Sequence, residues 1–206
     1  MKQLKNFLIL SSLFTSFAAQ ASFLSIGESG EILSGKDYQI GFSPQIATSG
    51  YSGVNAGAFL DAVWTEDMSS RFMLGVGEVD FYSSGSLKYI PFPDYERQPA
   101  MGLRGSFWYG REGSENITVF QIAPMVSKKY KSADYGTLVP YAAWGLNIGS
   151  EDGDSENGHQ FFIGTEWKSP QVENVNFSAE LALNLQNSVS GINFFVSIPF
   201  DNKTGF

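Results

Sequence analysis

The sequence contains no cysteine, and so it has neither a disulfide framework nor a thiol for acylation. This excludes a disulfide-stapled secreted domain and a lipoprotein anchor. It also lacks any apolar run of about 18 residues or more, which excludes a helical membrane protein. Charged residues make up only 17% of the chain, and histidine occurs once. Apolar residues must therefore be arranged in some way other than long continuous runs.

What is present is alternation, clearest near the end of the chain. Two neighbouring stretches, 175–186 and 192–200, place apolar residues at every second position, which is the period of a β-strand. Each is long enough to cross the hydrocarbon of a membrane when tilted. The mean hydropathy of -0.10 fits this interpretation, because averaging over alternating residues cancels the apolar signal.

The same pattern recurs along the chain and predicts an all-β fold. We expect an antiparallel up-and-down transmembrane β-barrel of about ten strands, with eight as the alternative if the short segment 86–92 belongs to a loop. Tight connections are expected at 48–53, 67–70 and 83–85. The expected strands are 37–46, 54–66, 72–82, 86–92, 101–110, 116–127, 138–149, 160–168, 175–186 and 192–200.

The beginning of the chain has the three ordered parts of a secretory signal. Lys2 and Lys5 precede an apolar stretch, and Ala19, Gln20 and Ala21 form an A-x-A cleavage site. We therefore expect a signal peptide at 1–21, a periplasmic lead-in with little structure at 22–35, a barrel at 36–200 and a tail at 201–206. About 185 residues remain after cleavage, which suits one domain.

With these features the chain resembles small bacterial outer-membrane β-barrel proteins, by pattern and without a subfamily motif. The final strand, 192–200, ends in Phe200 and is similar to the C-terminal signal that such proteins present to the barrel-assembly machinery, although residues 201–206 follow it. The resemblance implies location in the outer membrane and both termini in the periplasm. The outward loops would then lie near 48–53, 83–85, 111–115, 150–158 and 187–191.

Charged residues within the expected strands must point into the lumen, because a charge facing lipid costs about 2–4 kcal/mol. They form either an ion-paired core that fills a small barrel or, since acids exceed bases, an acidic conduit that prefers cations. The expected lumen residues are Asp61, Glu78, Asp80, Lys88, Arg104, Glu166, Lys168 and Glu180.

Aromatic residues on the opposite faces are expected to face the membrane, and those near strand ends are candidates for the belts at its two interfaces; the alternative is the core of a soluble barrel. These are Tyr38, Trp64, Tyr109, Trp144, Trp167, Phe194 and Phe200.

The loop 150–158 has enough oxygen ligands to suggest a cation site at Glu151, Asp152, Asp154 and Glu156, but its spacing does not match an EF-hand loop. A solvated loop is the simpler interpretation. The single histidine, His159, has no recognisable catalytic partner and no G-x-S-x-G elbow accompanies it, so we expect no enzyme activity and no catalytic residue.

Three functions remain open from sequence. The first is a structural, adhesive or envelope-maintenance barrel with a filled lumen, in contact with outer-membrane lipid and lipopolysaccharide and monomeric. The second is a narrow cation-preferring pore or small-solute carrier, and the third a secreted soluble barrel of the lipocalin kind. No cofactor is expected, and a net charge of -8 disfavours nucleic acid as a partner.

Overall fold

The computed structural model describes residues 24–33, 35–49, 53–151, 154–172 and 174–201. The signal peptide expected at 1–21 and most of the tail at 201–206 lie outside these ranges. Within them, no helix is long and apolar enough to cross a membrane. The strands are β1 (Tyr38–Ser49), β2 (Gly53–Val63), β3 (Met68–Gly77), β4 (Phe81–Phe92), β5 (Ala100–Glu112), β6 (Glu115–Ser127), β7 (Tyr130–Ser132), β8 (Gly136–Glu151), β9 (Asp154–Lys168), β10 (Asn176–Gln186) and β11 (Ser190–Phe200).

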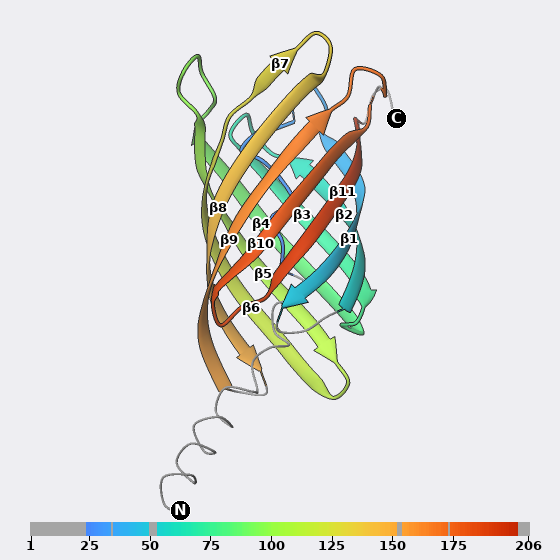
Figure 1. Ribbon diagram of the computed structural model, residues 1–206, viewed down its shortest axis with the longest axis vertical. Helices are drawn as coiled ribbons and strands as arrows, with labels where there is room; N and C mark the ends of the chain where they lie inside the picture. Colours follow the sequence, from blue (N-terminus) through green and yellow to red (C-terminus); the bar gives the residue numbers. More distant parts are fainter. Residues whose placement is uncertain (1–23, 34, 50–52, 152–153, 173, 202–206) are drawn as a thin grey trace, which may run out of the picture.

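Ten of these strands form a closed antiparallel ring. Neighbouring strands pair in sequence order, β6 pairs with β8, and the first and last strands close the sheet through pairs such as Tyr38 with Phe200. The short strand β7 pairs only with the start of β8 and extends beyond the ring (Figure 1). The expected fold is confirmed with ten strands, and the eight-strand alternative is wrong.

The wall has an apolar outside and a polar inside. On β2, for example, the side chain of Val54 is 60% exposed on the outer face, whereas Asn55 and Asp61 are buried inside. The outer face is built mainly from Leu, Ile, Val and Phe, while many buried side chains are Ser, Gln, Asn or charged. This polarity is the opposite of that of a soluble lipocalin-type barrel, and it suits a barrel surrounded by acyl chains.

The largest departure from the sequence-based expectation concerns β3 and β4. The predicted hairpin at 83–85 is wrong, because these residues lie inside β4, where Ser84 faces the lumen. The turn lies instead at residues 78–80, where the Glu78 N–H donates to the Val54 carbonyl and the Val79 N–H to Asn55 Oδ1. Small polar residues are common in turns, but a polar lumen also accepts them within a strand.

Moving this turn reverses the assignment of faces on β3. Phe72, Leu74 and Val76 point outward and are about half exposed, whereas Met73 is buried inside. Gly75 also faces the lumen, where the ring of Tyr82 on β4 lies against it at a distance that leaves no room for a Cβ. The sequence-based assignment counts Glu78 and Asp80 as part of the strand and uses their charges to choose the lumen face, so placing them in the turn exchanges the two faces.

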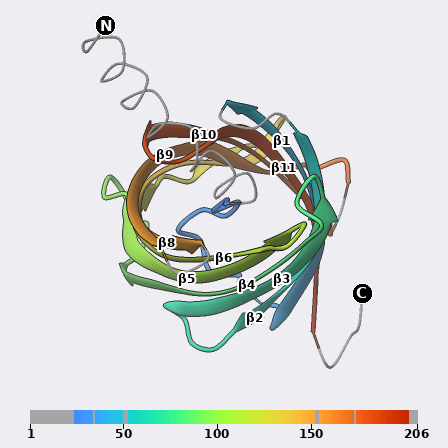
Figure 2. The same cartoon turned by 90° about the horizontal axis from the view of Figure 1, so that it is seen from below.

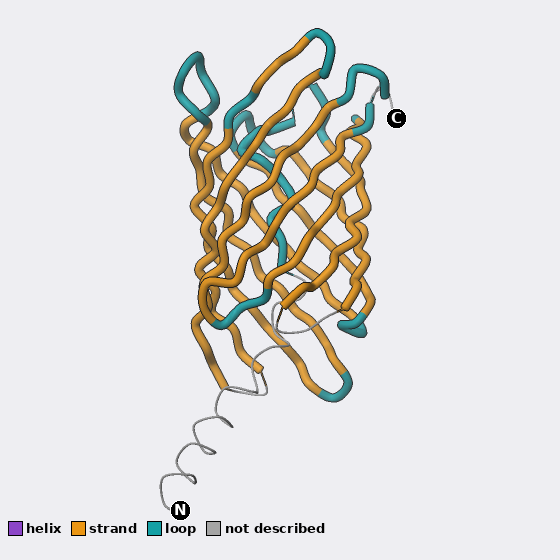
Figure 3. Tube along the Cα trace, in the orientation of Figure 1, coloured by secondary structure: helices purple, strands orange, loops and turns teal. Residues whose placement is uncertain are grey.

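Residues 24–33, which we call the lumen segment, run through the inside of the barrel. Figure 2 shows this segment, in blue, within the ring of strands, and Figure 3 shows it as a loop that passes between the two ends of the barrel. Its residues belong to no strand, yet Ile26 and Ser29 are fully buried. The prediction of a periplasmic lead-in at 22–35 is therefore wrong for this segment.

The two ends of the barrel differ. At the tight-turn end, the described connections 78–80, 113–114 and 187–189 each span two or three residues. At the opposite end, which we call the strand-terminus end, β1 begins, β11 ends, and longer connections include 93–99 and the segment that contains β7. Leu24 lies near the tight turns, beside Val189, and Glu31 lies near Lys129 at the strand-terminus end.

Candidate functional site in the barrel lumen

The first element of the lumen site is a buried ion pair between two neighbouring strands. Asp61 on β2 and Arg71 on β3 are direct cross-strand partners. Arg71 Nε donates to Asp61 Oδ1 at 2.7 Å and Nη2 to Oδ2 at 2.8 Å, which is the bidentate geometry of strong guanidinium–carboxylate pairs. The guanidinium also lies over the ring of Phe59, 4.1 Å from its centroid. Arg71 is therefore held rigidly while its remaining nitrogen points toward the lumen segment.

The second element is the carboxylate of Glu28, the central charge of the lumen segment. Its Oε2 lies 2.8 Å from Lys88 Nζ on β4, and its Oε1 lies 3.2 Å from Arg104 Nε on β5. The three side chains are at most 8% exposed. Two cations of the wall thus converge on one anion of the segment.

The third element is a set of hydrogen bonds between charged wall residues and the backbone of the lumen segment. Glu180 on β10 accepts the N–H of Ile26 at 3.1 Å and the N–H of Gly27 at 2.8 Å. Its carboxylate also accepts hydrogen bonds from Tyr141 and Asn193 of the wall. A buried carboxylate needs several donors to compensate for lost hydration, and here the segment supplies two of them.

The wall cations bind the carbonyl groups of the same segment. Arg104 Nη1 donates to the carbonyls of Ser25 and Ile26 at 2.9 and 3.0 Å, and Arg71 Nη1 donates to that of Ile26 at 3.2 Å. Lys88 Nζ donates to the carbonyls of Ser29 and Glu31, both at 2.9 Å. The wall therefore binds the lumen segment largely through its backbone.

Gly27 is the position in the segment that tolerates no side chain. Its φ of +62° lies in the left-handed region, and a Cβ there would come within 2.2 Å of the ring of Phe195. The sequence Ile26, Gly27, Glu28 thus provides a buried apolar anchor, a close approach and a central charge.

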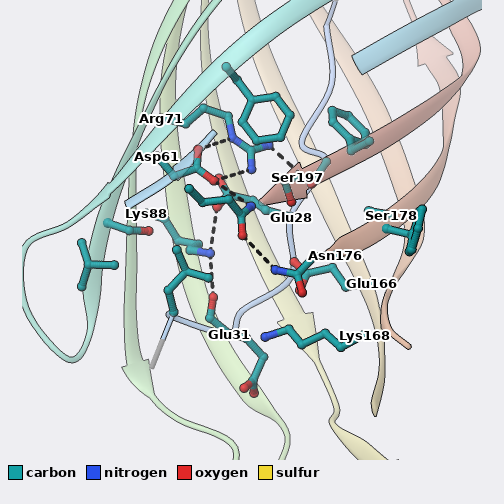
Figure 4. Close-up of a pocket in the computed structure, with 18 residues that line it drawn as sticks. Glu28, Glu31, Asp61, Arg71, Lys88, Glu166, Lys168, Asn176, Ser178 and Ser197 are labelled. Carbon is teal, nitrogen blue, oxygen red and sulfur yellow. Dashed lines mark hydrogen bonds and ion pairs between the residues drawn. The ribbon is translucent and has the colours of Figure 1, made fainter. Parts of the chain in front are cut away.

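At the strand-terminus end the segment is held by further contacts. The Ser29 N–H donates to Glu166 Oε1, the Gly30 N–H donates to Ser127 Oγ at 3.1 Å, and Lys129 forms an ion pair with Glu31. A cavity of about 40 Å³ lies beside Glu28 and is lined by Lys168 among others (Figure 4). That volume holds only a few water molecules, so the segment and the wall fill this part of the lumen.

The structure brings together most of the charged residues expected in the lumen. Lys88, Arg104 and Glu180 contact the lumen segment, Asp61 pairs with Arg71, and Glu166 and Lys168 line the cavity. The placement of Glu78 and Asp80 is wrong, because both are exposed at the turn after β3. Asp80 Oδ2 there accepts the N–H of Gly113 at 2.8 Å.

Sequence reasoning missed Arg71 and Glu28. Arg71 was overlooked because the expected strand began at residue 72, whereas β3 begins at Met68 and pairs Arg71 directly with Asp61. Glu28 gave no periodic signal, since it belongs to no strand. An acidic residue in a Gly-Ser-rich stretch predicts a solvated loop. Only the contacts with Lys88 and Arg104 of the wall show that Glu28 is buried.

The expected interface aromatics all lie on the outer face or at its edges. Tyr38, Trp64, Trp167 and Phe200 lie near strand ends at the strand-terminus end, and the rings of Tyr38 and Phe200 stack 5.5 Å apart. Tyr109 lies near the tight turns. Trp144 and Phe194 lie in the middle of β8 and β11, so they contact the centre of the apolar band and do not belong to a belt.

The expected loop cation site cannot be built from its four residues, because the side chains of 151–154 lie outside the described ones. Glu156 Oε1 accepts a hydrogen bond from Asn187 Nδ2. Among the described residues, no group of three or more His, Cys, Asp and Glu side chains is placed to hold a metal ion. His159 lies against the ring of Trp144, with centroids 6.4 Å apart.

The fold and the lumen together define a class: a closed ten-stranded barrel with an apolar exterior and an internally bound segment. No family model and no curated protein matches the sequence. Similar solved structures include a de novo designed transmembrane β-barrel, at 11% identity, covering 84% of this chain and 97% of that one, with a TM-score of 0.41. The β domain of the Bordetella autotransporter BrkA shares 10% identity, with 81% and 98% covered and a TM-score of 0.48. Ail, the attachment invasion locus protein of Yersinia pestis, shares 11% identity, with 84% and 99% covered and a TM-score of 0.26.

Proposed function

We propose that this chain is an integral protein of the bacterial outer membrane whose lumen is closed by its own residues 24–33. It would act as a structural or surface-contact component of the envelope, as a monomer without enzyme activity. Its partners would be outer-membrane lipid and lipopolysaccharide, and the barrel-assembly machinery during insertion. The observation that carries the proposal is the combination of an apolar outer face with a lumen filled by an ion-paired segment.

The polarity of the wall supports the membrane placement. Side chains such as Leu74, Leu103 and Leu181 are exposed on the outer face of central strand positions, where water would hydrate them unfavourably. Acyl chains accept the same surface, and a closed sheet leaves no unpaired edge in the hydrocarbon. A monomer in water would expose far more apolar surface than soluble proteins usually tolerate.

The filled lumen supports a closed resting state. The lumen segment extends between the two ends of the barrel, and its backbone is bound from several strands. The excess of acidic groups that favoured a cation-preferring pore is lost, because Glu78 and Asp80 lie outside the lumen and Arg71 lies inside it. The cation-preferring alternative therefore has no support from the charges of the wall.

Membrane fractionation with heat-modifiable gel migration tests the placement. We expect the native protein in the outer-membrane fraction, migrating faster before boiling than after it. The purified chain in planar bilayers should show no sustained conductance. Recovery of a folded protein in the soluble fraction, or a steady current from the native chain, would contradict the proposal.

A further inference from the structure

The lumen segment is bound in a way that allows it to leave without opening the sheet. Residues 24–33 pair with no strand, and the contacts described above come from wall side chains such as Glu180, Arg104 and Lys88. The ten-stranded ring is closed independently of them, through the pairing of β1 with β11. The barrel and its internal segment are therefore separable parts of one chain.

Removing the segment would leave the charged side chains of the wall facing an open lumen. The wall residues that contact the segment or line the cavity beside Glu28 comprise four cations and three anions among those described. The cations are Arg71, Lys88, Arg104 and Lys168, and the anions are Asp61, Glu166 and Glu180. Near the two ends of the segment, Lys129 and Glu156 add one charge of each sign.

The positions of these charges favour the cations more than their numbers do. Asp61 stays paired with Arg71 whether or not the segment is present. Lys88 and Arg104, in contrast, both pair with Glu28 and would lose it together. Glu180 would lose the two N–H donors of the segment but would keep the donors of the wall, Tyr141 and Asn193. Two neighbouring cations on β4 and β5 would then face the path that the backbone of the segment now occupies, and positive side chains that line a pore favour anions.

From these contacts we propose that the barrel is an anion-preferring pore gated by its own N-terminal segment, with Glu28 acting as a tethered anion that occupies the conduction site. The proposal rests on the membrane placement proposed above and adds an open state to it. The permeant species would be small inorganic or organic anions that replace the Glu28 carboxylate between Lys88 and Arg104. No covalent step is involved.

The principal test is conductance in planar bilayers under a KCl gradient. A variant that lacks residues 24–33 should conduct, with a reversal potential displaced toward that of chloride, while the native chain stays closed. Its folding is checked first by heat-modifiable migration. A peptide with the sequence of residues 24–33, added in solution, should block the current, and the same peptide with Glu28→Lys should not.

Point variants keep the test independent of the deletion. Glu28→Gln should raise the frequency of openings at least tenfold, whereas Glu115→Gln, at an exposed position at the start of β6 that does not contact the segment, should leave it within about twofold of the native value. A double variant, Gly30→Cys with Ser127→Cys, places two thiols where a Cβ of residue 30 would lie 2.8 Å from Ser127 Oγ. Combined with Glu28→Gln, it should be silent when oxidised and open when reduced.

The outcomes separate the two proposals. A folded, membrane-inserted deletion variant or Glu28→Gln variant that carries no current overturns the gated pore and leaves the closed barrel standing. Cation preference in the deletion variant, or equal current from the oxidised and reduced cysteine variants, also overturns it. A native chain that fails to enter the outer membrane overturns the proposed function itself.

Discussion

Asp61 and Arg71 show how a single pair of residues connects the sheet to the lumen. Their side chains meet because β2 and β3 are hairpin neighbours in direct register, and their charges are tolerated because each compensates the other. A buried charge without a partner is costly. The pair itself therefore contributes little net stability, but removing one member would leave the other charge buried and unpaired.

Removing one member of this pair should be strongly destabilising. We expect Asp61→Ala to lower the free energy of unfolding by about 3–5 kcal/mol, because Arg71 would remain buried without its carboxylate. The double variant Asp61→Ala with Arg71→Met should recover part of that loss. Urea unfolding in lipid vesicles measures both, and a double variant less stable than the single one would contradict this explanation.

Gly27 is the second residue whose chemistry is set by its surroundings. We expect Gly27→Ala to displace the lumen segment, because the substitution meets both a positive φ and the ring of Phe195, at a cost of about 1–3 kcal/mol. Gly35→Ala is the matched control, since Gly35 has a φ of +76° with no atom near its Cβ position.

The temperature at which gel migration converts to the unfolded form compares the two glycine variants. A larger decrease for Gly27→Ala than for Gly35→Ala isolates the contribution of the Phe195 contact. Equal decreases would mean that backbone strain alone is responsible.

At the scale of elements, the hairpin of β3 and β4 decides which side chains face lipid. The turn at 78–80 places Leu74 outward and Met73 inward, the reverse of the assignment that follows from a turn at 83–85. Placing the turn at 78–80 also removes Glu78 and Asp80 from the lumen and leaves Arg71 inside it, so the net charge expected in the lumen changes sign.

The outward position of Leu74 predicts a specific sensitivity. Leu74→Lys should reduce the free energy of unfolding in vesicles by about 2–4 kcal/mol, since the ammonium would face the hydrocarbon. Glu78→Lys, in the turn at the end of the same hairpin, should change it by less than about 0.5 kcal/mol. A well-tolerated lysine at position 74 would argue for the opposite face.

The connection 93–99 is held to the segment after β6 by one ionic contact. Asp94 Oδ1 lies 2.5 Å from Lys128 Nζ, and its Oδ2 accepts the N–H of Lys129 at 2.6 Å. Partial burial by itself would raise the pKa of the Asp94 carboxyl, but these hydrogen bonds and the two lysine charges hold that pKa below its ordinary value. Lys128 Nζ also donates to the carbonyls of Glu96 and Gln98.

Because the folded pKa of Asp94 is lowered, its contribution is present above the unfolded value of about 3.9 and is lost as the pH falls through the folded pKa. A spin label on Arg97→Cys should therefore be immobile at neutral pH and become mobile only in strongly acidic solution. The same label in an Asp94→Asn background should be mobile throughout. If the mobility of the label did not depend on pH either with Asp94 present or in the Asp94→Asn background, the role of Asp94 would be contradicted.

For the whole molecule, the difference between the two ends of the barrel bears on its orientation in the membrane. The two- and three-residue turns lie at the end that the resemblance to outer-membrane proteins assigns to the outside, although longer outer loops are the usual arrangement. The expectation that both chain ends face the periplasm does not agree with this orientation, because Leu24 lies near the tight turns whereas β11 ends at the opposite end. Carrying short turns across the hydrocarbon exposes fewer polar backbone groups than carrying long connections, and so we expect the tight turns outside.

Single cysteines test this orientation, since the native chain has none. A membrane-impermeant maleimide should label Ser114→Cys, at the tight-turn end, on intact cells. Arg97→Cys, at the strand-terminus end, should react only after the membrane is permeabilised. The reverse pattern would place the strand termini outside and the beginning of the lumen segment in the periplasm.

Much of the barrel was accessible from sequence because its physical cause is local. The alternation of residues 192–200, for instance, marks β11 whatever surrounds it, and the same holds for β5, β6, β8, β9 and β10. The inward charges Asp61, Lys88, Arg104 and Glu180 followed from the cost of placing a charge in lipid. Ambiguity arose where small polar residues suit both a turn and a polar lumen, as at Ser84 in β4.

The sequence by itself determined the class of fold and the polarity of the wall, because strand period and apolar alternation depend only on neighbouring residues. Tertiary structure alone decided what fills the lumen. Glu28 lies far in sequence from Lys88 and Arg104, and no local pattern relates an aperiodic segment to strands that close around it. The lumen site exists only because ring closure brings cations from separate strands onto one short, Gly-containing stretch of chain.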